Sequence, residues 1–391
     1  MSGEVVVRPV ASLRDRRAFV ELPFRLHSSS PQWVPPLRLE RHLFLSPRVN
    51  AFFRSGEAQL FLAERRGRVV GRISAHVDRA LNDYHSNRWG LFGFLELEDD
   101  PEVAAALFDA AETWLRERGR DRMVGPMDFR MNDESGILIE GYDQLPVVKQ
   151  PWHPPYYRAM CEGAGLEKVI DLYFWGLVMA DRAEMLPVLV ELAEQLGPKH
   201  GITIERMSRR RLRRDLDLFA EIYNHAWRRN WGFVPYGKAD LDHYAQELQL
   251  VFDRKFFMIA RNRAGEAVAM AITIPDVNQA LKRMNGRLLP LGWWHFLSRS
   301  RYIDRARIGF LGVKPDYQHT GVAAALYVEN FEVGVRIGMH KGEAGWILET
   351  NTAMNRGMEA MHSRIVKRLR MYERRFEPDA EPAMPEGAAP A

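Results

Sequence analysis

The clearest chemical pattern in the sequence is a short polar loop between an apolar strand and a helix. Residues 306–313 are apolar apart from Arg307 and favour a strand, and Gln318, Gly321 and Ala323 follow where a helix begins. A helix N-terminus presents free N–H groups and a partial positive charge, and residues without bulky side chains let phosphate oxygens approach the backbone. The pattern therefore predicts a phosphate-binding loop. The alternative is an ordinary strand–helix turn in which Gly321 relieves crowding.

The elements that would position this loop have counterparts in the first half of the chain. Residues 59–78 and 256–276 each contain an apolar strand, a charged turn with a glycine and a second strand, which indicates a β-hairpin. A strand and a helix precede each hairpin, and a strand and a longer helix follow it, at 101–119 and at 321–338. This order appears twice, which predicts α/β domains with mixed sheets.

The length of the chain suits two domains. At 391 residues, both halves can bury real cores. We expect an N-terminal domain over residues 1–180 and a C-terminal domain over residues 181–376. Residues 377–391 are rich in Pro, Ala and Glu, and they have too little apolar surface to fold, so we expect a disordered tail there.

The first half differs from the second at the position of the loop. Glu98, Asp99 and Asp100 stand directly before the helix that begins at Pro101. Three carboxylates at a helix start would repel a pyrophosphate. The simpler interpretation is that they complement the positive end of the helix dipole. We expect the first half to keep the fold but not a phosphorylated cofactor.

The loop resembles the coenzyme-A-binding motif of the GNAT superfamily of N-acetyltransferases, Gln/Arg-x-x-Gly-x-Gly/Ala. The resemblance implies a tandem pair of GNAT-like domains, each a mixed central sheet flanked by helices, with a degenerate N-terminal domain. It also implies a coenzyme A thioester as co-substrate, with its pyrophosphate on the loop and its pantetheine arm on the preceding strand. The cofactor-binding residues implied in this way are Leu311, Gly312, Val313, Gln318, His319, Thr320, Gly321, Val322 and Ala323.

Other segments resemble one bacterial branch of such two-half proteins, and together they cover most of the chain up to Phe376. Some members of that branch are described as bacterial ceramide synthases, which transfer a long acyl chain from coenzyme A to the amine of a sphingoid base. Many others carry only a generic acetyltransferase label. His153 departs from the branch, which often has Asn before the Pro-Pro-Tyr-Tyr run. The segments are residues 21–38, 125–146, 151–173, 228–235 and 285–297.

The resemblance suggests candidates for the chemistry of acyl transfer. Glu349 lies in a strand that would diverge from residues 306–313 beside the thioester, so it is our candidate base, or else a glutamate on a solvated strand face. Asn351 follows and could orient substrate or cap the next helix. We assign the proton donor to the leaving thiolate to Tyr372, with Tyr327 as the alternative.

Several polar and aromatic residues are candidates for the acceptor site. Asn132 and Glu134 lie in a polar stretch that either lines a cleft between the halves or forms a backbone turn. Two aromatic runs could form walls of the same cleft, or could instead pack the halves together. The predicted substrate residues are Asn132, Glu134, Tyr156, Tyr157, Asn230 and Trp231.

Composition limits the remaining possibilities. One cysteine excludes an intrachain disulfide, and the N-terminus has no apolar core of a signal peptide, so we expect a cytoplasmic protein. The histidines and the cysteine show no metal-ligand spacing, and we predict no metal. Residues 282–307 carry two tryptophans flanked by arginines, which indicates either peripheral contact with an anionic membrane or a segment that covers the sheet. No nucleic-acid module is recognisable.

These observations predict an acyl-CoA-dependent N-acyltransferase. A long acyl chain and a sphingoid-base amine are the more specific version, in which an apolar tunnel leaves the thioester site. A small-molecule N-acetyltransferase and a non-catalytic acyl-CoA-binding protein are the alternatives that the sequence leaves open.

Overall fold

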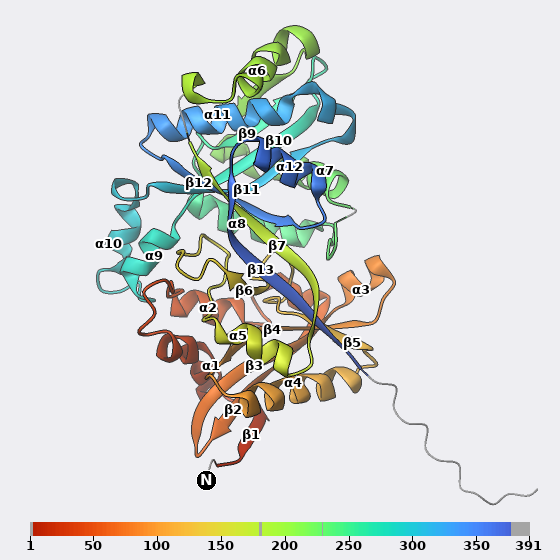
Figure 1. The fold of residues 1–391 in the computed structure, drawn as a ribbon, viewed down its shortest axis with the longest axis vertical. Helices are drawn as coiled ribbons and strands as arrows, with labels where there is room; N and C mark the ends of the chain where they lie inside the picture. The colour runs from red at the N-terminus through yellow and green to blue at the C-terminus, as the bar shows by residue number, and fades with distance from the viewer. Residues whose placement is uncertain (1–2, 180–181, 229, 377–391) are drawn as a thin grey trace, which may run out of the picture.

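The computed structural model describes residues 3–179, 182–228 and 230–376. The boundary expected between residues 180 and 181 and the tail expected over 377–391 lie outside these residues. Within them, the strands form one 13-stranded mixed sheet with helices packed on it, which confirms the predicted α/β architecture (Figure 1). Both predicted hairpins are present, because β2 pairs with β3 and β9 pairs with β10, each antiparallel.

The first half begins with an edge strand and ends with a long strand at the centre of the sheet. Its elements are β1 (Val5–Pro9), α1 (Leu13–Leu26), α2 (Arg38–Phe44), η1 (Ala51–Arg54), β2 (Gly56–Arg65), β3 (Arg68–Asp78), α3 (Arg79–His85), β4 (Trp89–Leu97), α4 (Pro101–Arg116), β5 (Arg122–Gly125), β6 (Ile137–Glu140), α5 (Tyr156–Gly163) and β7 (Glu167–Val178).

The second half repeats the order with additional helices around the hairpin. Its elements are η2 (Arg182–Glu184), α6 (Pro187–His200), β8 (Thr203–Arg206), η3 (Arg209–Arg211), α7 (Leu212–Ala226), α8 (Lys238–Val251), β9 (Phe257–Arg261), β10 (Ala267–Pro275), α9 (Asn278–Met284), α10 (Gly292–Leu297), η4 (Arg299–Arg301), β11 (Arg305–Val313), η5 (Pro315–Thr320), α11 (Val322–Arg336), β12 (Lys341–Leu348), α12 (Thr352–Ala360) and β13 (Arg364–Arg375).

The two halves exchange strands at the middle of the sheet. β7 and β13 run antiparallel side by side through the centre of the molecule (Figure 1). The end of β7 pairs with β12 of the second half, with Val178 opposite Lys341. The end of β13 pairs with β5 of the first half, with Tyr372 opposite Gly125. The last strand of each half therefore extends into the other, and the sheet is continuous from β1 to β8.

The acidic residues before α4 act as the simpler interpretation predicts. The carboxylate of Asp100 accepts a hydrogen bond from the N–H of Glu102 at 3.0 Å and caps the helix. Arg65 pairs with both of these acids. The start of α4 is therefore already neutralised by the protein's own charges.

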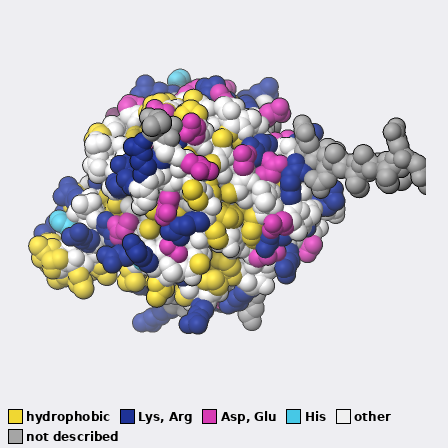
Figure 2. All heavy atoms as spheres, turned by 90° about the horizontal axis from the view of Figure 1, so that it is seen from below, with side chains coloured by type: hydrophobic (Ala, Val, Ile, Leu, Met, Phe, Trp, Pro, Cys, Tyr) yellow, Lys and Arg dark blue, Asp and Glu magenta, His cyan; other side chains and the backbone are white. Residues whose placement is uncertain are grey.

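The segment that carries the two tryptophans forms a short helix, α10, on the outside of the molecule. Its exposed apolar side chains are Leu288, Leu289, Leu291, Trp293, Trp294 and Leu297, which we call the α10 patch. Figure 2 shows hydrophobic side chains gathered with Lys and Arg on the projecting end at the left, where Figure 1 places α10. Over the described ranges, no helix is both long enough and apolar enough to cross a bilayer.

Candidate functional site

Two parallel strands of the second half, β11 and β12, separate from one another along their length. β11 and β12 pair over only four residues each, and the last pair is Ile308 with Ala344. Beyond this point β11 follows β10 and β12 follows β7, because each strand keeps its other neighbour. A cavity of about 390 Å³ opens between them. We call it the wedge cavity.

At Gly312 the wall of the wedge cavity is formed by backbone alone, because a side chain there would collide with its neighbours. A Cβ atom at Gly312 would lie 2.7 Å from Cζ3 of Trp227 and 2.8 Å from Cζ of Phe310. No side chain therefore fits at this position without moving the indole. Residues of the predicted pantetheine-binding strand, Leu311 to Val313, line the cavity, and so does Asn230. This wall is the edge of β11, whose backbone N–H and C=O groups can form hydrogen bonds with an extended arm that contains amides.

The predicted phosphate loop lies at the mouth of the same cavity, where Gln318 and Ala323 line it. Gly321 has a left-handed backbone (φ 79°), and no side chain caps the helix that begins after it. A Cβ atom at Gly321 would lie 3.1 Å from Cβ of Leu192 on α6. Backbone conformation and packing against α6 thus require this glycine, while the uncapped N-terminus of α11 stays available to an anion.

The other loop residues have separate environments. Thr320 is buried and donates a hydrogen bond to the carbonyl of Tyr317 at 2.6 Å. His319 is exposed, and its ring lies 6.3 Å from that of His200. Val322 is buried in the core beneath the loop. Of the six predicted loop residues, the structure brings Gln318 and Ala323 to the cavity wall.

Tyr327 is a buried tyrosine at the wall of the wedge cavity. It lies on α11, is 5% exposed and lines the cavity. Its hydroxyl has no hydrogen-bond partner among the described residues. Burial raises the pKa of this phenol, so it keeps its proton at neutral pH. Such a group can donate a proton to an anion formed in the cavity.

Tyr372 is not brought to this cavity. It lies in the part of β13 that enters the first half, is fully buried there, and donates to Oε1 of Glu162 at 3.2 Å. Because β13 crosses between the halves, a residue that the chain order assigns to the second half belongs to the core of the first. Of the two tyrosines considered as proton donors, the geometry favours Tyr327.

The candidate base Glu349 points toward β7. One carboxylate oxygen lies 2.8 Å from Nζ of Lys168, and the other accepts the N–H of Asp171 at 3.0 Å. It does not line the wedge cavity. Asn351 does line it, and its Oδ1 also accepts the N–H of Met354 at 3.2 Å, so both roles considered for Asn351 are compatible with its position.

A second cavity of about 320 Å³ adjoins the first. The two share walls formed by Trp227, Phe310 and Trp346. The second is enclosed mainly by aromatic and aliphatic side chains of α7 and α8 and extends to Leu250 and Phe296, beside the α10 patch. We call it the apolar cavity.

Asn132 and Arg307 are two of the polar side chains that line the apolar cavity. Asn132 lines it and donates to the hydroxyl of Tyr223 at 3.0 Å. Arg307 lines it too, and its guanidinium donates to the carbonyl of Gly345 (Nη2···O 3.1 Å) and to the carbonyl of Val148. Arg307 thus joins β11 and β12 just where they separate, and it also holds a segment of the first half against them. Burial lowers its pKa, although the group remains cationic at neutral pH.

In the first half, tyrosines occupy the strand edge that corresponds to the wedge. Tyr156 donates from its hydroxyl to the carbonyl of Leu97 at 2.8 Å, and the N–H of Leu97 donates to the hydroxyl of Tyr157 at 3.1 Å. The backbone N–H and carbonyl of Leu97, at the end of β4, are therefore already bonded within the protein. Tyr156 and Tyr157, predicted as cleft walls, fill the first half instead. Trp231 packs between the halves against Trp89, with ring centroids 6.1 Å apart.

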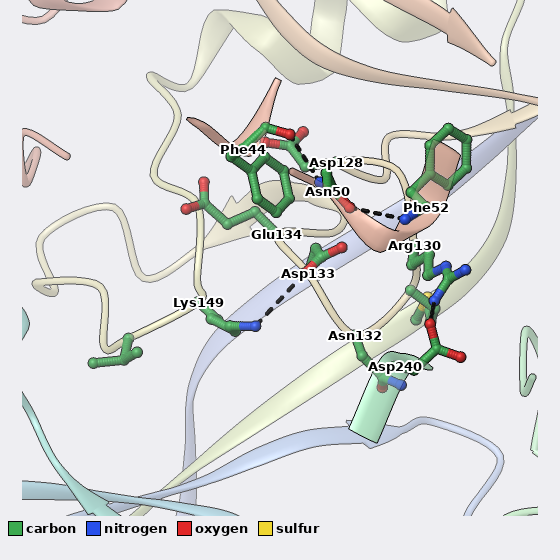
Figure 3. A network of polar contacts seen from close by, with 12 residues as sticks. Phe44, Asn50, Phe52, Asp128, Arg130, Asn132, Asp133, Glu134, Lys149 and Asp240 are labelled. Carbon is green, nitrogen blue, oxygen red and sulfur yellow. Dashed lines mark hydrogen bonds and ion pairs between the residues drawn. The ribbon is translucent and has the colours of Figure 1, made fainter. Parts of the chain in front are cut away.

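A third cavity, of about 250 Å³, lies in the first half and contains Glu134. Asp128 lines the same cavity, and Figure 3 shows it near Glu134. Arg41 lies 3.9 Å from Asp128 and 3.7 Å from Glu134. Burial and the neighbouring charge of Glu134 raise the pKa of Asp128 to about 8. We call this space the acidic cavity. It shares Glu40, Val148, Lys149 and Leu281 with the apolar cavity.

Three residues at these sites were not predicted. Arg307 could have been noticed as a charged residue at the start of a strand whose remaining residues, from Ile308 to Val313, are apolar or glycine. Trp227 and Asp128 carry no comparable signal, because a tryptophan near a helix end and an aspartate in a polar loop are both common. Their importance comes from which strands and loops are brought together.

The comparisons with known proteins agree with this geometry. No family model matches the chain. The chain is 34% identical over 382 residues to Protein YghO of Escherichia coli (strain K12), and the match covers 96% of this chain and 97% of that protein. It is 34% identical over 380 residues to a protein named bacterial ceramide synthase of Caulobacter vibrioides, with 95% and 98% covered.

Two solved structures share the fold at low sequence identity. A tandem GNAT protein from the clavulanic acid biosynthesis pathway matches with a TM-score of 0.57 at 14% identity, covering 96% of this chain and 100% of that one. A GCN5-related N-acetyltransferase from Sphaerobacter thermophilus matches with a TM-score of 0.54 at 13% identity, with 96% and 97% covered. The chain therefore has a tandem GNAT fold and belongs to the family that contains the Caulobacter bacterial ceramide synthase and the Escherichia coli protein YghO.

Proposed function

We propose that the protein transfers an acyl group from coenzyme A to an amine in the wedge cavity. The observation that carries this proposal is the cavity itself, where three features meet. They are the edge of β11 beyond its pairing with β12, the helix N-terminus at Gly321, and the hydroxyl of Tyr327, which finds no partner in the part of the chain that the structure describes. The residues present fit the coenzyme, because any side chain at Gly312 would crowd this wall of the cavity. The coenzyme supplies an activated acyl group when bound.

The chain's own groups would divide the work as follows. The N–H groups at the start of α11 and Gln318 bind the phosphates, and the edge of β11 holds the pantetheine arm and polarises the acyl carbonyl. Tyr327 gives its proton to the departing thiolate and takes one back from solvent, and the C–N bond forms as the C–S bond breaks. The amine loses its proton to solvent, since no carboxylate is among the described residues that line the wedge cavity.

The apolar cavity supports a long acyl chain as the group that is transferred. A short acetyl group would leave this space of about 320 Å³ unused, whereas a hydrocarbon chain gains about 0.8 kcal/mol for each buried CH₂. The Caulobacter relative is named a bacterial ceramide synthase, which favours a sphingoid-base amine as acceptor. This amine acceptor and the long chain are part of the proposal.

The α10 patch supports the proposal that the protein acts on a substrate at a membrane surface. Its exposed tryptophans and leucines lie beside Arg287, Arg299 and Arg301, an arrangement that suits the headgroup region of an anionic membrane. The apolar cavity reaches Phe296 of the same helix. A hydrocarbon chain could therefore move between membrane and cavity over a short apolar path.

The proposal is tested by measuring thiol release from a panel of acyl-CoAs that ranges from acetyl to palmitoyl. Each donor is assayed with and without a sphingoid base, and the amide product is identified by mass spectrometry. Gly312→Ala should abolish coenzyme binding by moving Trp227 into the cavity. The matched control is Gly163→Ala, where a Cβ meets no atom within 4 Å. Amine-dependent release with long chains alone is the expected result. Release with acetyl-CoA alone would return the protein to a small-molecule acetyltransferase, and no coenzyme binding would overturn the proposal.

A further inference from the structure

The apolar cavity has one end at the wedge cavity and the other at the surface helix α10. At the wedge end, Phe310 and Trp346 line both cavities. At the other end, the wall contains Leu250 of α8 and Phe296 of α10. Figure 1 shows α10 at the outer edge of the molecule, away from β11 and β12, which form the wedge. A hydrocarbon chain that enters the apolar cavity from the wedge therefore runs toward α10.

Phe296 is the residue at which the enclosed space ends. Its ring lines the cavity, whereas Leu250 at the same end is 66% exposed. The next residue of α10, Leu297, is 64% exposed, and Trp293 and Trp294 are exposed as well. The space beyond the ring is thus the surface of the molecule. A chain that stops before the ring is buried over its whole length, whereas a longer chain has to displace the ring.

Arg299 holds this ring in place through three contacts. Its guanidinium carbon lies 4.3 Å from the centroid of the Phe296 ring, within the range of a cation–π contact. Nη1 donates to the carbonyl of Phe296 at 2.9 Å, and Nη2 donates to the carbonyl of Leu250 at 3.5 Å. One planar side chain therefore covers the ring and ties its backbone to the end of α8. A lysine ammonium is compact and cannot make all three contacts.

A second aromatic contact holds α10 from another side. The hydroxyl of Tyr302 donates to the carbonyl of His295, and the guanidinium carbon of Arg283 lies 3.9 Å from the centroid of the Tyr302 ring. Arg283 belongs to α9, so this contact joins α10 to the helix before it. The position of Phe296 is therefore fixed by contacts to both α8 and α9.

The wall between the wedge and Phe296 includes aliphatic side chains from the end of α8 and from α9. Leu248 and Val251 come from α8, and Leu281 comes from α9. These side chains offer no hydrogen-bonding groups, so they suit a hydrocarbon. Each methylene that they bury should tighten binding roughly fourfold. The number of methylenes that fit before the ring then sets how tightly a given chain binds.

We propose that Phe296 limits the length of the acyl chain that the protein accepts, and that Arg299 is the positioning residue for its ring. This inference rests on the proposed function and names the residue that sets its preference among acyl donors. Chains that end before the ring bind more tightly as they lengthen, and chains that reach it gain nothing further.

The test is the binding of S-alkyl thioethers of coenzyme A, with alkyl chains of four to eighteen carbons, to the full chain by calorimetry. A thioether cannot transfer its chain, so the measurement needs no acceptor amine. We expect affinity to rise roughly fourfold with each added methylene and then to stop rising at one chain length. In Phe296→Ala the rise should continue for about three carbons more, because the lost ring leaves space. A wild-type affinity that rises over the whole series would overturn the proposal.

Leu297→Ala is the matched control for Phe296→Ala. Leu297 is 64% exposed on the same helix and is not among the described residues that line the apolar cavity. Its length profile should equal that of the wild type. An unchanged profile in Phe296→Ala, or an equal shift in Leu297→Ala, would show that Phe296 does not limit the chain.

Arg299→Lys tests the positioning role. It should move the end of the rise in the same direction as Phe296→Ala, by fewer carbons, since the ring remains but loses its support. Arg301→Lys is the control, because Arg301 is exposed in the same short helix, η4. A loss of stability without a shift in the length profile would mean that Arg299 only holds α10 to α8.

Binding of coenzyme A without an alkyl chain separates this inference from the proposed function. Phe296→Ala should bind it with wild-type affinity, which also shows that the variant is folded. If the wild type bound neither coenzyme A nor any thioether, the proposed function would fail and this inference with it. If the thioethers bind with a length profile that Phe296→Ala leaves unchanged, this inference alone is overturned.

Discussion

The guanidinium of Arg307 donates to the carbonyl oxygen of Gly345 at 3.1 Å, at the point where β11 and β12 stop pairing. It also donates to Val148 of the first half, so a single side chain ties both strands at the wedge to a segment of the first half. Lysine has the same charge but cannot bridge two carbonyls in this way.

We therefore expect Arg307→Lys to lower kcat/KM for acyl transfer more than tenfold. Loss of the bridge should cost about 1–3 kcal/mol in the free energy of unfolding, because a buried carbonyl loses its donor. Arg305→Lys is the control: Arg305 joins Asp276 to the carbonyl of Leu145 and should cost stability without a comparable loss of activity. Equal loss of activity in both variants would mean that Arg307 only holds the halves together.

Tyr327→Phe should separate stability from chemistry. The buried hydroxyl of Tyr327 has no partner within the described ranges, so its removal should leave the free energy of unfolding unchanged or raise it by about 1 kcal/mol. Acyl transfer should fall about 100-fold, because a positioned proton donor contributes roughly that much. Tyr372→Phe should do the reverse and lower stability by about 1 kcal/mol through the lost bond to Glu162, with little effect on transfer. Stopped-flow thiol detection and urea unfolding measure both quantities.

Glu349→Gln should leave kcat within a few-fold of the wild type. The carboxylate is bound to Lys168 and to the backbone of Asp171 on the side of β7, where it cannot accept a proton from an amine in the wedge cavity. The exposed ion pair contributes about 0.2–1 kcal/mol, so a small loss of stability is the expected effect. A fall in kcat with a shifted pH profile would restore Glu349 as the base.

The stability of the protein should depend on pH through Asp128. Its folded-state pKa is raised to about 8, whereas the pKa of an aspartate in an unfolded chain is about 3.9. Between these values the folded state binds the extra proton, so the contribution is fully present below the unfolded pKa and is lost as pH rises to about 8. Asp128→Asn should remove this loss, and urea unfolding from pH 5 to pH 8 measures it. Parallel curves for the two proteins would contradict the assignment.

Liposome sedimentation tests the α10 patch. Leu291→Ser should weaken binding to vesicles with anionic lipid about tenfold, since a leucine side chain is worth about 1.5–3 kcal/mol when fully buried. Leu13→Ser is the matched control, because Leu13 is 85% exposed on α1, outside the patch. Binding should weaken with salt, as charge attraction is screened. Equal binding of both variants would leave the patch without a role at membranes.

The sequence by itself determined the elements that depend on neighbouring residues. The hairpins, the helix starts at Pro101 and Val322, and the loop from Gln318 to Ala323 follow from hydrophobic period, capping and glycine positions, which are local. The family resemblance added the second half as the site of the coenzyme.

Only the tertiary structure decided which side chains face one another. The exchange of β7 and β13 places Tyr372 in the first half, and hydrogen bonding to β7 turns Glu349 away from the wedge. The same assembly brings Arg307 to Gly345 and leaves Asp128 beside Glu134. Strand pairing between distant segments sets these contacts, and no periodicity along the chain records which strands will be neighbours.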